Sequence, residues 1–235
     1  AVGGLMDAFH TMADKLRESR QQRASSFRGT LMSLVQTIEA KDEYTSNHSS
    51  NVSKYAEKLA RAHGMSEEDI SGIAAGGLLH DIGKIGIPDE IINKPGKLTP
   101  EEFNIIAEHP VICERIVKPL EGSEVLVPLV RHHHEHWDGS GYPDGLAAAQ
   151  IPLPARIIAV ADVFEALTSE RSYRKKMPVE KAVGILQEES GKTLDPQLVE
   201  LFTCQVIPQI KHLLAEPAHD AQQDLNTEQP LLIAP

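Results

Sequence analysis

The sequence contains few of the residues that mark several large classes of protein. Two cysteines, Cys113 and Cys204, are too few for a disulfide framework and indicate a reducing, cytosolic compartment. Aromatic residues make up only 4% of the chain, so the core must be built from aliphatic side chains. No apolar run approaches the roughly 18 residues that a membrane-spanning helix needs. No stretch alternates with a period of two residues for long enough to predict a good strand.

Basic residues are also scarce: the chain has 23 of them against 34 acidic residues, and a net charge of −11. This balance argues against binding to a nucleic acid polymer, because neutralising phosphates needs clustered lysine and arginine. An anionic substrate would have to be held by a local basic patch or by metal ions. Histidine, by contrast, is abundant: the chain has 11, and four of them lie within residues 132–136.

Helical patterns cover most of the chain. One long helix is predicted over residues 5–40, and the region from Ser46 to Leu214 reads as helical almost throughout, except for a glycine- and proline-rich loop at 135–152. Gly64 ends one of these helices, and Ser66 caps the next. We predict an all-α fold in three parts: a signalling helix at 1–34, a helical domain at 35–215 and a disordered polar tail at 216–235.

Apolar residues of the N-terminal helix follow the 4-3-4 spacing of a coiled coil. The pattern comprises Leu5, Phe9, Met12 and Leu16, is interrupted at Arg20 and Arg23, and resumes at Phe27, Leu31, Leu34 and Ile38. The helix therefore either pairs in a homodimer or packs on its own domain. Residues 2–19 resemble the last helix of a HAMP linker. That resemblance implies the cytoplasmic domain of a membrane-bound sensor whose N-terminal part is absent here.

Histidine and aspartate recur at the ends of the predicted helices. His80 and Asp81 end an apolar helix, His109 opens another, and Asp162 is the only acid between Ile157 and Phe164. Imidazole nitrogen and carboxylate oxygen suit Fe, Mn, Zn or Ni. The alternatives are a hydrogen-bonded core histidine at each position and, for Asp162, a salt bridge to Arg156 or Lys84.

Three long motifs occur in order: HDIGKIGIPD (80–89), HHEHWDGSGYPDGL (133–146) and IPLPARIIAVADVFEALTSERSYR (151–174). Together they resemble the HD-GYP family, a branch of the HD metal-dependent phosphohydrolases. The resemblance covers about residues 35–215. It implies an HD-type helical bundle that hydrolyses cyclic di-GMP to the linear dinucleotide pGpG and, in some members, to GMP.

The resemblance also implies a site for two divalent metal ions. Asp81 would bridge them, and the other ligands would be His48, His80 and Asp162 for one ion and His109, His133 and His134 for the other. Fe or Mn is favoured, and Zn, Ni and Mg remain alternatives. Some members bind a third ion through a glutamate four residues before the first histidine. Here that position is Tyr44, so we expect two ions.

Other residues match substrate-binding positions of the family. Lys84 would contact the scissile phosphate or the attacking water, unless it only pairs with Asp162. Arg171 and Arg174 would bind phosphate oxygens, and Tyr142 in the GYP loop would contact substrate or support the site. The sequence departs from the family at Glu165 for Asp, Leu194 for Phe, Asn51 for Arg and Ser172 for Pro, and none of these is a ligand position.

The resemblance leaves several functions open. A phosphodiesterase for cyclic di-GMP is the leading hypothesis, and one for another cyclic dinucleotide such as 3′,3′-cGAMP is the nearest alternative. A catalytically inactive cyclic-dinucleotide receptor and an HD enzyme acting on other nucleotides are more distant. The expected partners are a cyclic dinucleotide, a second copy of the chain through the N-terminal helix, and a diguanylate cyclase or adaptor protein at the GYP loop.

Overall fold

The structure is a computed structural model that describes residues 2–41, 47–120, 122–169 and 176–215, and in these ranges it is all-α, as predicted. The helices are α1 (Val2–Lys41), α2 (His48–His63), α3 (Glu67–Leu79), α4 (Asp89–Ile92), α5 (Pro100–Ile106), α6 (His109–Val117), α7 (Ser123–His132), α8 (Leu153–Thr168), α9 (Val179–Glu189), α10 (Pro196–Leu201) and α11 (Ile207–Ala215). Shorter turns are the 3₁₀ segments η1 (Ile82–Gly86) and η2 (Ala148–Gln150) and the π-helical η3 (Phe202–Val206).

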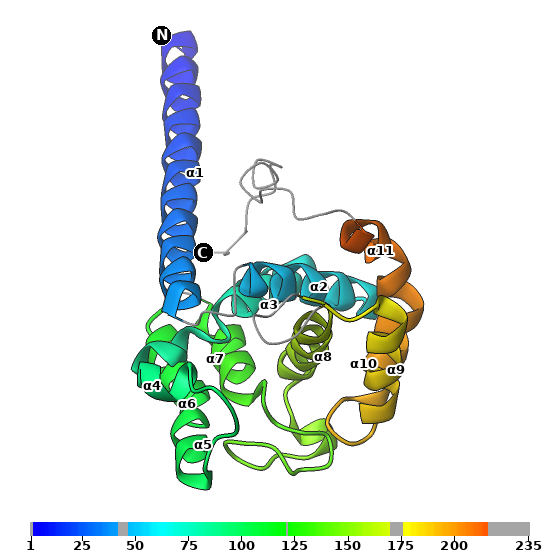
Figure 1. Ribbon diagram of the computed structural model, residues 1–235. Helices are drawn as coiled ribbons and strands as arrows, with labels where there is room; N and C mark the ends of the chain where they lie inside the picture. Colours follow the sequence, from blue (N-terminus) through cyan, green and yellow to red (C-terminus); the bar gives the residue numbers. More distant parts are fainter. Residues whose placement is uncertain (1, 42–46, 121, 170–175, 216–235) are drawn as a thin grey trace.

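Helix α8 lies at the centre of the bundle. It packs against α2, α3, α7, α9 and α10, which surround it in Figure 1. Its apolar residues, including Ile157, Ile158 and Val160, are fully buried, which explains why this helix shows little amphipathic pattern in the sequence. The core is aliphatic as expected, apart from an aromatic cluster in which the Phe164 ring lies 5.4 Å from that of Tyr55 and 5.1 Å from that of Phe202.

Local capping signals place most helix ends where the sequence predicts them. Gly64 follows α2 in the left-handed conformation with φ of 85°, and the Ser66 side chain accepts a hydrogen bond from the amide of Asp69. Thr99 and Glu102 form a reciprocal capping box at the start of α5. Between α10 and α11 the helical region is interrupted by the η3 π-turn, which periodicity alone does not reveal.

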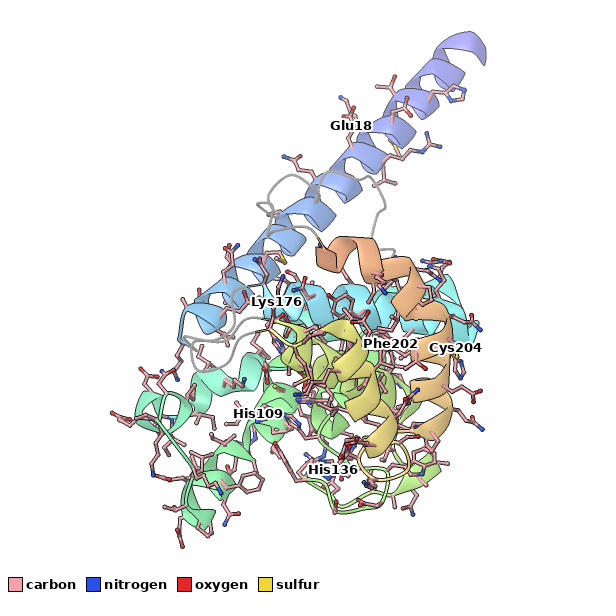
Figure 2. The ribbon with its side chains drawn as sticks, turned by 45° about the vertical axis from the view of Figure 1, so that its right-hand side comes forward. Glu18, His109, His136, Lys176, Phe202 and Cys204 are labelled. Carbon is pink, nitrogen blue, oxygen red and sulfur yellow. The ribbon has the colours of Figure 1, made fainter. Side chains whose placement is uncertain are left out.

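Helix α1 meets the bundle only near its C-terminal end, and its N-terminal part extends away (Figures 1 and 2, where Glu18 is labelled). Val35 and Ile38 are buried, whereas Met12 and Leu16 are 70% and 53% exposed. Packing on its own domain is therefore found only for the last turns of α1. Pairing with a second copy stays a prediction, and the side chains of Leu5, Phe9, Arg20, Arg23 and Phe27 lie outside the described side chains.

Several predictions fall on residues that the structure does not describe. These are the tail at 216–235, Tyr44 and the two arginines Arg171 and Arg174. Within the described residues, no helix has both the length and the apolar character that crossing a bilayer requires.

Candidate metal centre

Seven side chains from five segments of the chain converge at α8. They fall into two groups, in each of which the nitrogen and oxygen donors lie within 4.8 Å of one another: His48, His80 and Asp162 in the first, and Asp81, His109, His133 and His134 in the second. Donors that share an ion through bonds of about 2.1 Å stand about 3–4 Å apart, so the spacing suits two ions. This division agrees with the ligand sets that the family resemblance implies.

Asp81 lies between the two groups. One carboxylate oxygen, Oδ1, is 3.4 Å from Nε2 of His109 in the second group. The other, Oδ2, is 3.5 Å from Nε2 of His80 and 3.9 Å from Nε2 of His48 in the first group. A single carboxylate that presents one oxygen to each group has the arrangement of a bridging ligand.

Hydrogen bonds turn the histidine rings so that Nε2 faces the centre. The Nδ1 atoms of His80, His109 and His133 lie 2.8, 2.8 and 2.9 Å from the carbonyl oxygen three residues earlier in the chain. A ring that donates from Nδ1 keeps its lone pair on Nε2, which is the form that binds metal. Nε2 of His80 is buried without a hydrogen-bond partner among the described residues, and an ion would satisfy it.

Glu165 gives His48 the same orientation by a different route. Its Oε2 lies 2.5 Å from Nδ1 of His48. Its Oε1 accepts from the Ser169 hydroxyl and lies 3.4 Å from the side-chain nitrogen Nδ2 of Asn51. The Glu165 side chain is almost fully buried. Sequence reasoning identified Glu165 and Asn51 only as departures from the family, and their contact shows that the two departures occur in one hydrogen-bonded group.

Burial and charge set the protonation of the centre. Burial, reinforced by neighbouring imidazoles, lowers the pKa of His133 well below its usual range and that of His134 to about 3. Burial would raise the pKa of Asp81, but Lys84 and the nearby histidines hold it well below its usual value. His133 and His134 are therefore neutral imidazoles and Asp81 is an ionised carboxylate, the forms that bind a cation.

His48 behaves differently because carboxylates surround it. Burial would lower its pKa, but the hydrogen bond to Glu165 and the charge of Asp162 raise it to about 9. An ion entering the first group must displace this proton from Nε2, while the Nδ1 proton stays on the Glu165 side. The chemistry of both donor groups therefore fits the metal ions that the resemblance implies.

Lys84 and Arg156 each contact a carboxylate other than that of Asp162. Nζ of Lys84 lies 2.8 Å from Oδ2 of Asp81, and Arg156 pairs with Asp195 at 2.5 Å. Asp162 lies 3.4 Å from Nε2 of His48. The carboxylate of Asp162 is thus placed with the histidines, and the ammonium group of Lys84 lies at the bridging carboxylate.

Comparison with known proteins agrees with this geometry. The model of the HD domain family matches residues 32–198, which is more than half of the chain. This chain belongs to the HD domain family. The solved structure of the cyclic GMP-AMP specific phosphodiesterase V-cGAP3 of Vibrio cholerae aligns with a TM-score of 0.63 and 20% identity, over 80% of this chain and 50% of that one. At this identity the likeness concerns the fold.

Curated relatives of this HD domain include enzymes for two cyclic dinucleotides. The chain is 39% identical over 192 residues to the cyclic di-GMP phosphodiesterase response regulator RpfG of Xanthomonas campestris, covering 81% of this chain and 51% of the relative. It is also 39% identical over 160 residues to the 3′3′-cGAMP-specific phosphodiesterase 3 of Vibrio cholerae, covering 68% and 35%. The HD domain thus spans about half or less of the length of these relatives.

The GYP loop of this HD domain supports the second ligand group. The Tyr142 ring stacks on His134 with centroids 5.0 Å apart, and its amide donates to the His134 carbonyl. Buried Glu135 accepts hydrogen bonds from the amides of Asp144 and Leu146 at 2.7 and 3.0 Å. These contacts fix the loop against the end of α7 and hold His134 in place.

A third group of potential ligands, His132, Glu135 and Asp144, lies beside this loop. The guanidinium of Arg131 donates to both carboxylate oxygens of Asp144 at 2.8 Å and to Glu114 at 2.6 Å. Arg131 thus pairs with Asp144, and Glu135 accepts from loop amides, so these carboxylates anchor the loop. His132, the extra histidine of the sequence motif, belongs here and not to the metal centre.

Gly83 allows the turn after Asp81 to reach α6. A Cβ atom at this position would lie 2.1 Å from the carbonyl oxygen of His109 and 2.7 Å from the amide of Cys113. Because both neighbours are backbone, they cannot yield as a flexible side chain would. This close approach brings Asp81 beside His109, and the glycine of the HDIGK motif is the sequence signal for it.

Proposed function

We propose that this HD domain is a metal-dependent phosphodiesterase that hydrolyses cyclic di-GMP to pGpG. The observation that carries the proposal is the pair of ligand groups that share Asp81. The relatives named above, which are phosphodiesterases for cyclic dinucleotides, support the substrate class. Divalent ions bound at such a centre supply Lewis acidity and lower the pKa of water. We propose Fe or Mn, because the donors are mainly imidazole nitrogen with carboxylate oxygen.

The chain's own residues have distinct parts in this proposal. Asp81 holds the two ligand groups together, and Lys84 adds a positive charge 2.8 Å from it, where the scissile phosphate would bind. Tyr142 keeps His134 in its orientation and presents its ring at the edge of the centre. Arg171 and Arg174 come soon after α8, the helix that carries Asp162, in the sequence.

The proposal is tested by purifying the protein without chelator, measuring bound Fe and Mn, and separating the products formed from cyclic di-GMP by chromatography. We expect pGpG to appear in the metal-loaded protein and not after treatment with a chelator. Parallel incubation with 3′,3′-cGAMP tests the second candidate, which the equal identity to the Vibrio enzyme favours. Tight binding of either dinucleotide without turnover would instead indicate a receptor.

Replacing Arg171 or Arg174 by alanine should weaken substrate binding and leave metal content unchanged. Each charge-assisted contact to a phosphate oxygen contributes about 1.5–3 kcal/mol, so KM should rise about tenfold to a hundredfold. Steady-state kinetics and metal analysis measure the two effects. Lys192→Ala, which removes an exposed lysine elsewhere, is the control. Unchanged KM and kcat in both arginine variants would make the cluster an ordinary solvated surface.

We further propose that α1 dimerises this HD domain as the cytoplasmic output of a membrane-bound sensor, and that the GYP loop receives a diguanylate cyclase or adaptor. The exposed Met12 and Leu16 support pairing, because an apolar stripe of this length needs a partner. Light scattering should show a dimer for the whole chain and a monomer after truncation to Phe27. A monomer of the whole chain at micromolar concentration would refute the pairing.

A further inference from the structure

The last turn of α1 contacts two of the chain segments that bring metal ligands to the centre. Glu39 reaches the N-terminus of α2, which begins with His48, and Lys41 reaches the turn that follows Asp81. The C-terminal end of α1 lies at the bundle in Figure 1, and the remainder of the helix extends away from it. Glu39 and Lys41 of α1 therefore bond to backbone groups within a few residues of the metal ligands His48 and Asp81.

Glu39 caps α2 from outside that helix. The N-cap residue of α2, Asn47, has a φ of 66° and makes no capping hydrogen bond with its side chain. Instead, the Glu39 carboxylate accepts hydrogen bonds from the amides of Asn47 at 3.3 Å and Ser49 at 3.0 Å, on either side of His48. A carboxylate at this end satisfies unpaired amides and matches the positive end of the helix dipole. The start of α2, and with it the ring of His48, is thus held by α1.

Lys41 caps the C-terminal end of the η1 turn. Its ammonium group donates to the carbonyl oxygens of Lys84 at 3.2 Å, Ile85 at 3.2 Å and Ile87 at 2.5 Å. It also pairs with Asp89 at 3.2 Å. These carbonyls end the η1 turn, where a cation is favourable. The turn that carries Lys84, immediately after Asp81, is thus also held by α1.

Apolar contacts fix the same turns of α1 between the two segments. Val35 and Ile38 are 3% and 6% exposed, and they line one small hollow together with Ser49 of α2 and with Asp81 and Ile82 of the HD segment. Burial of these two side chains keeps Glu39 and Lys41 at a fixed distance from the centre.

We propose that Glu39 and Lys41 are positioning residues that form a clamp between α1 and the metal centre. The clamp sets the position of His48 relative to Asp81 and Lys84, and so the spacing of the two ligand groups. A displacement of α1 therefore acts on both groups at once. The clamp rests on the proposed function only for its effect on turnover, because its effects on backbone protection and metal binding need no substrate.

Hydrogen exchange of the metal-free protein tests the two contacts separately. In Lys41→Met, the amides of Lys84 and Ile87, which bond within the η1 turn, should exchange about tenfold faster or more. In Glu39→Ala, the faster amides should be those at the start of α2, and Glu39→Gln, which keeps an acceptor, should show a smaller change. Peptides from α9 and α10 should be unaffected in all variants.

Metal binding and turnover then test whether the clamp positions the centre. We expect the Kd for Mn²⁺ to rise about tenfold in Lys41→Met and in Glu39→Ala, with kcat reduced about tenfold and KM for cyclic di-GMP changed by less than twofold. Lys15→Met, an exposed lysine far along the same helix, is the matched control.

Two results would overturn the clamp. One is exchange in both variants equal to that of Lys15→Met, and the other is faster exchange with unchanged Mn²⁺ affinity. If the parent protein does not hydrolyse cyclic di-GMP, the proposed function fails, while the exchange and Mn²⁺ measurements still decide the clamp.

Discussion

Replacing Asp81 by alanine is expected to reduce hydrolysis of cyclic di-GMP at least about a thousandfold and to lower the metal content. Among the described residues, this carboxylate is the one that presents an oxygen to each ligand group. Its Oδ1 lies 3.4 Å from Nε2 of His109, and its Oδ2 lies 3.5 Å from Nε2 of His80. Loss of several kcal/mol of transition-state stabilisation corresponds to such a factor. Product chromatography and elemental analysis of the purified variant measure the two effects.

Asp81→Asn is the matched variant, because it keeps the size of the side chain and removes only its charge. It should lose activity nearly as far as Asp81→Ala. Both variants also leave Lys84 without the partner that lies 2.8 Å away, so the thermal midpoint of the metal-free protein should fall. Turnover near the parent rate in either variant would refute the shared-carboxylate centre.

Replacing Glu165 by alanine should weaken metal binding about 10- to 100-fold. Its carboxylate accepts the Nδ1 proton of His48, and outer hydrogen bonds of this kind orient a ligating ring and raise its basicity. Removing it takes away the hydrogen bond that orients the His48 ring and the carboxylate charge that stabilises its protonated form. Isothermal titration calorimetry of the metal-free protein with Mn²⁺ measures the affinity.

Two further variants separate orientation from general damage. Glu165→Gln keeps an acceptor for His48 and should lie between the parent and Glu165→Ala. Glu188→Gln changes an exposed glutamate on α9 and should have no effect. Equal Mn²⁺ affinity in the parent and in Glu165→Ala would show that the backbone alone positions His48.

Much of the ligand set could be predicted because its residues stand at recognisable helix ends. His80, His109 and His133 each occur where a helix starts or stops, and each bonds from Nδ1 to a carbonyl three residues earlier. This geometry is local, so it accompanies the motif in the sequence. The capping signals at Gly64 and Ser66 are local for the same reason, and the helix ends that they predict are confirmed.

The contacts between distant segments could not be predicted in this way. Glu165 reaches His48 across 117 residues of chain, and Lys41 reaches Ile87 across 46. In the sequence these are an ordinary glutamate in an apolar helix and a lysine at a helix end. Neither has a local pattern that names its partner.

The sequence by itself determined the all-α class, the aliphatic core and the identity of the seven candidate ligands, because composition, helix caps and motifs are properties of short segments. Only the tertiary structure decided that Lys84 lies at the carboxylate of Asp81, that Glu165 bonds to His48, and that the end of α1 contacts the η1 turn and the start of α2. These features depend on the packing of α2 against α8 and of η1 against α6, which brings together segments that lie far apart in the sequence.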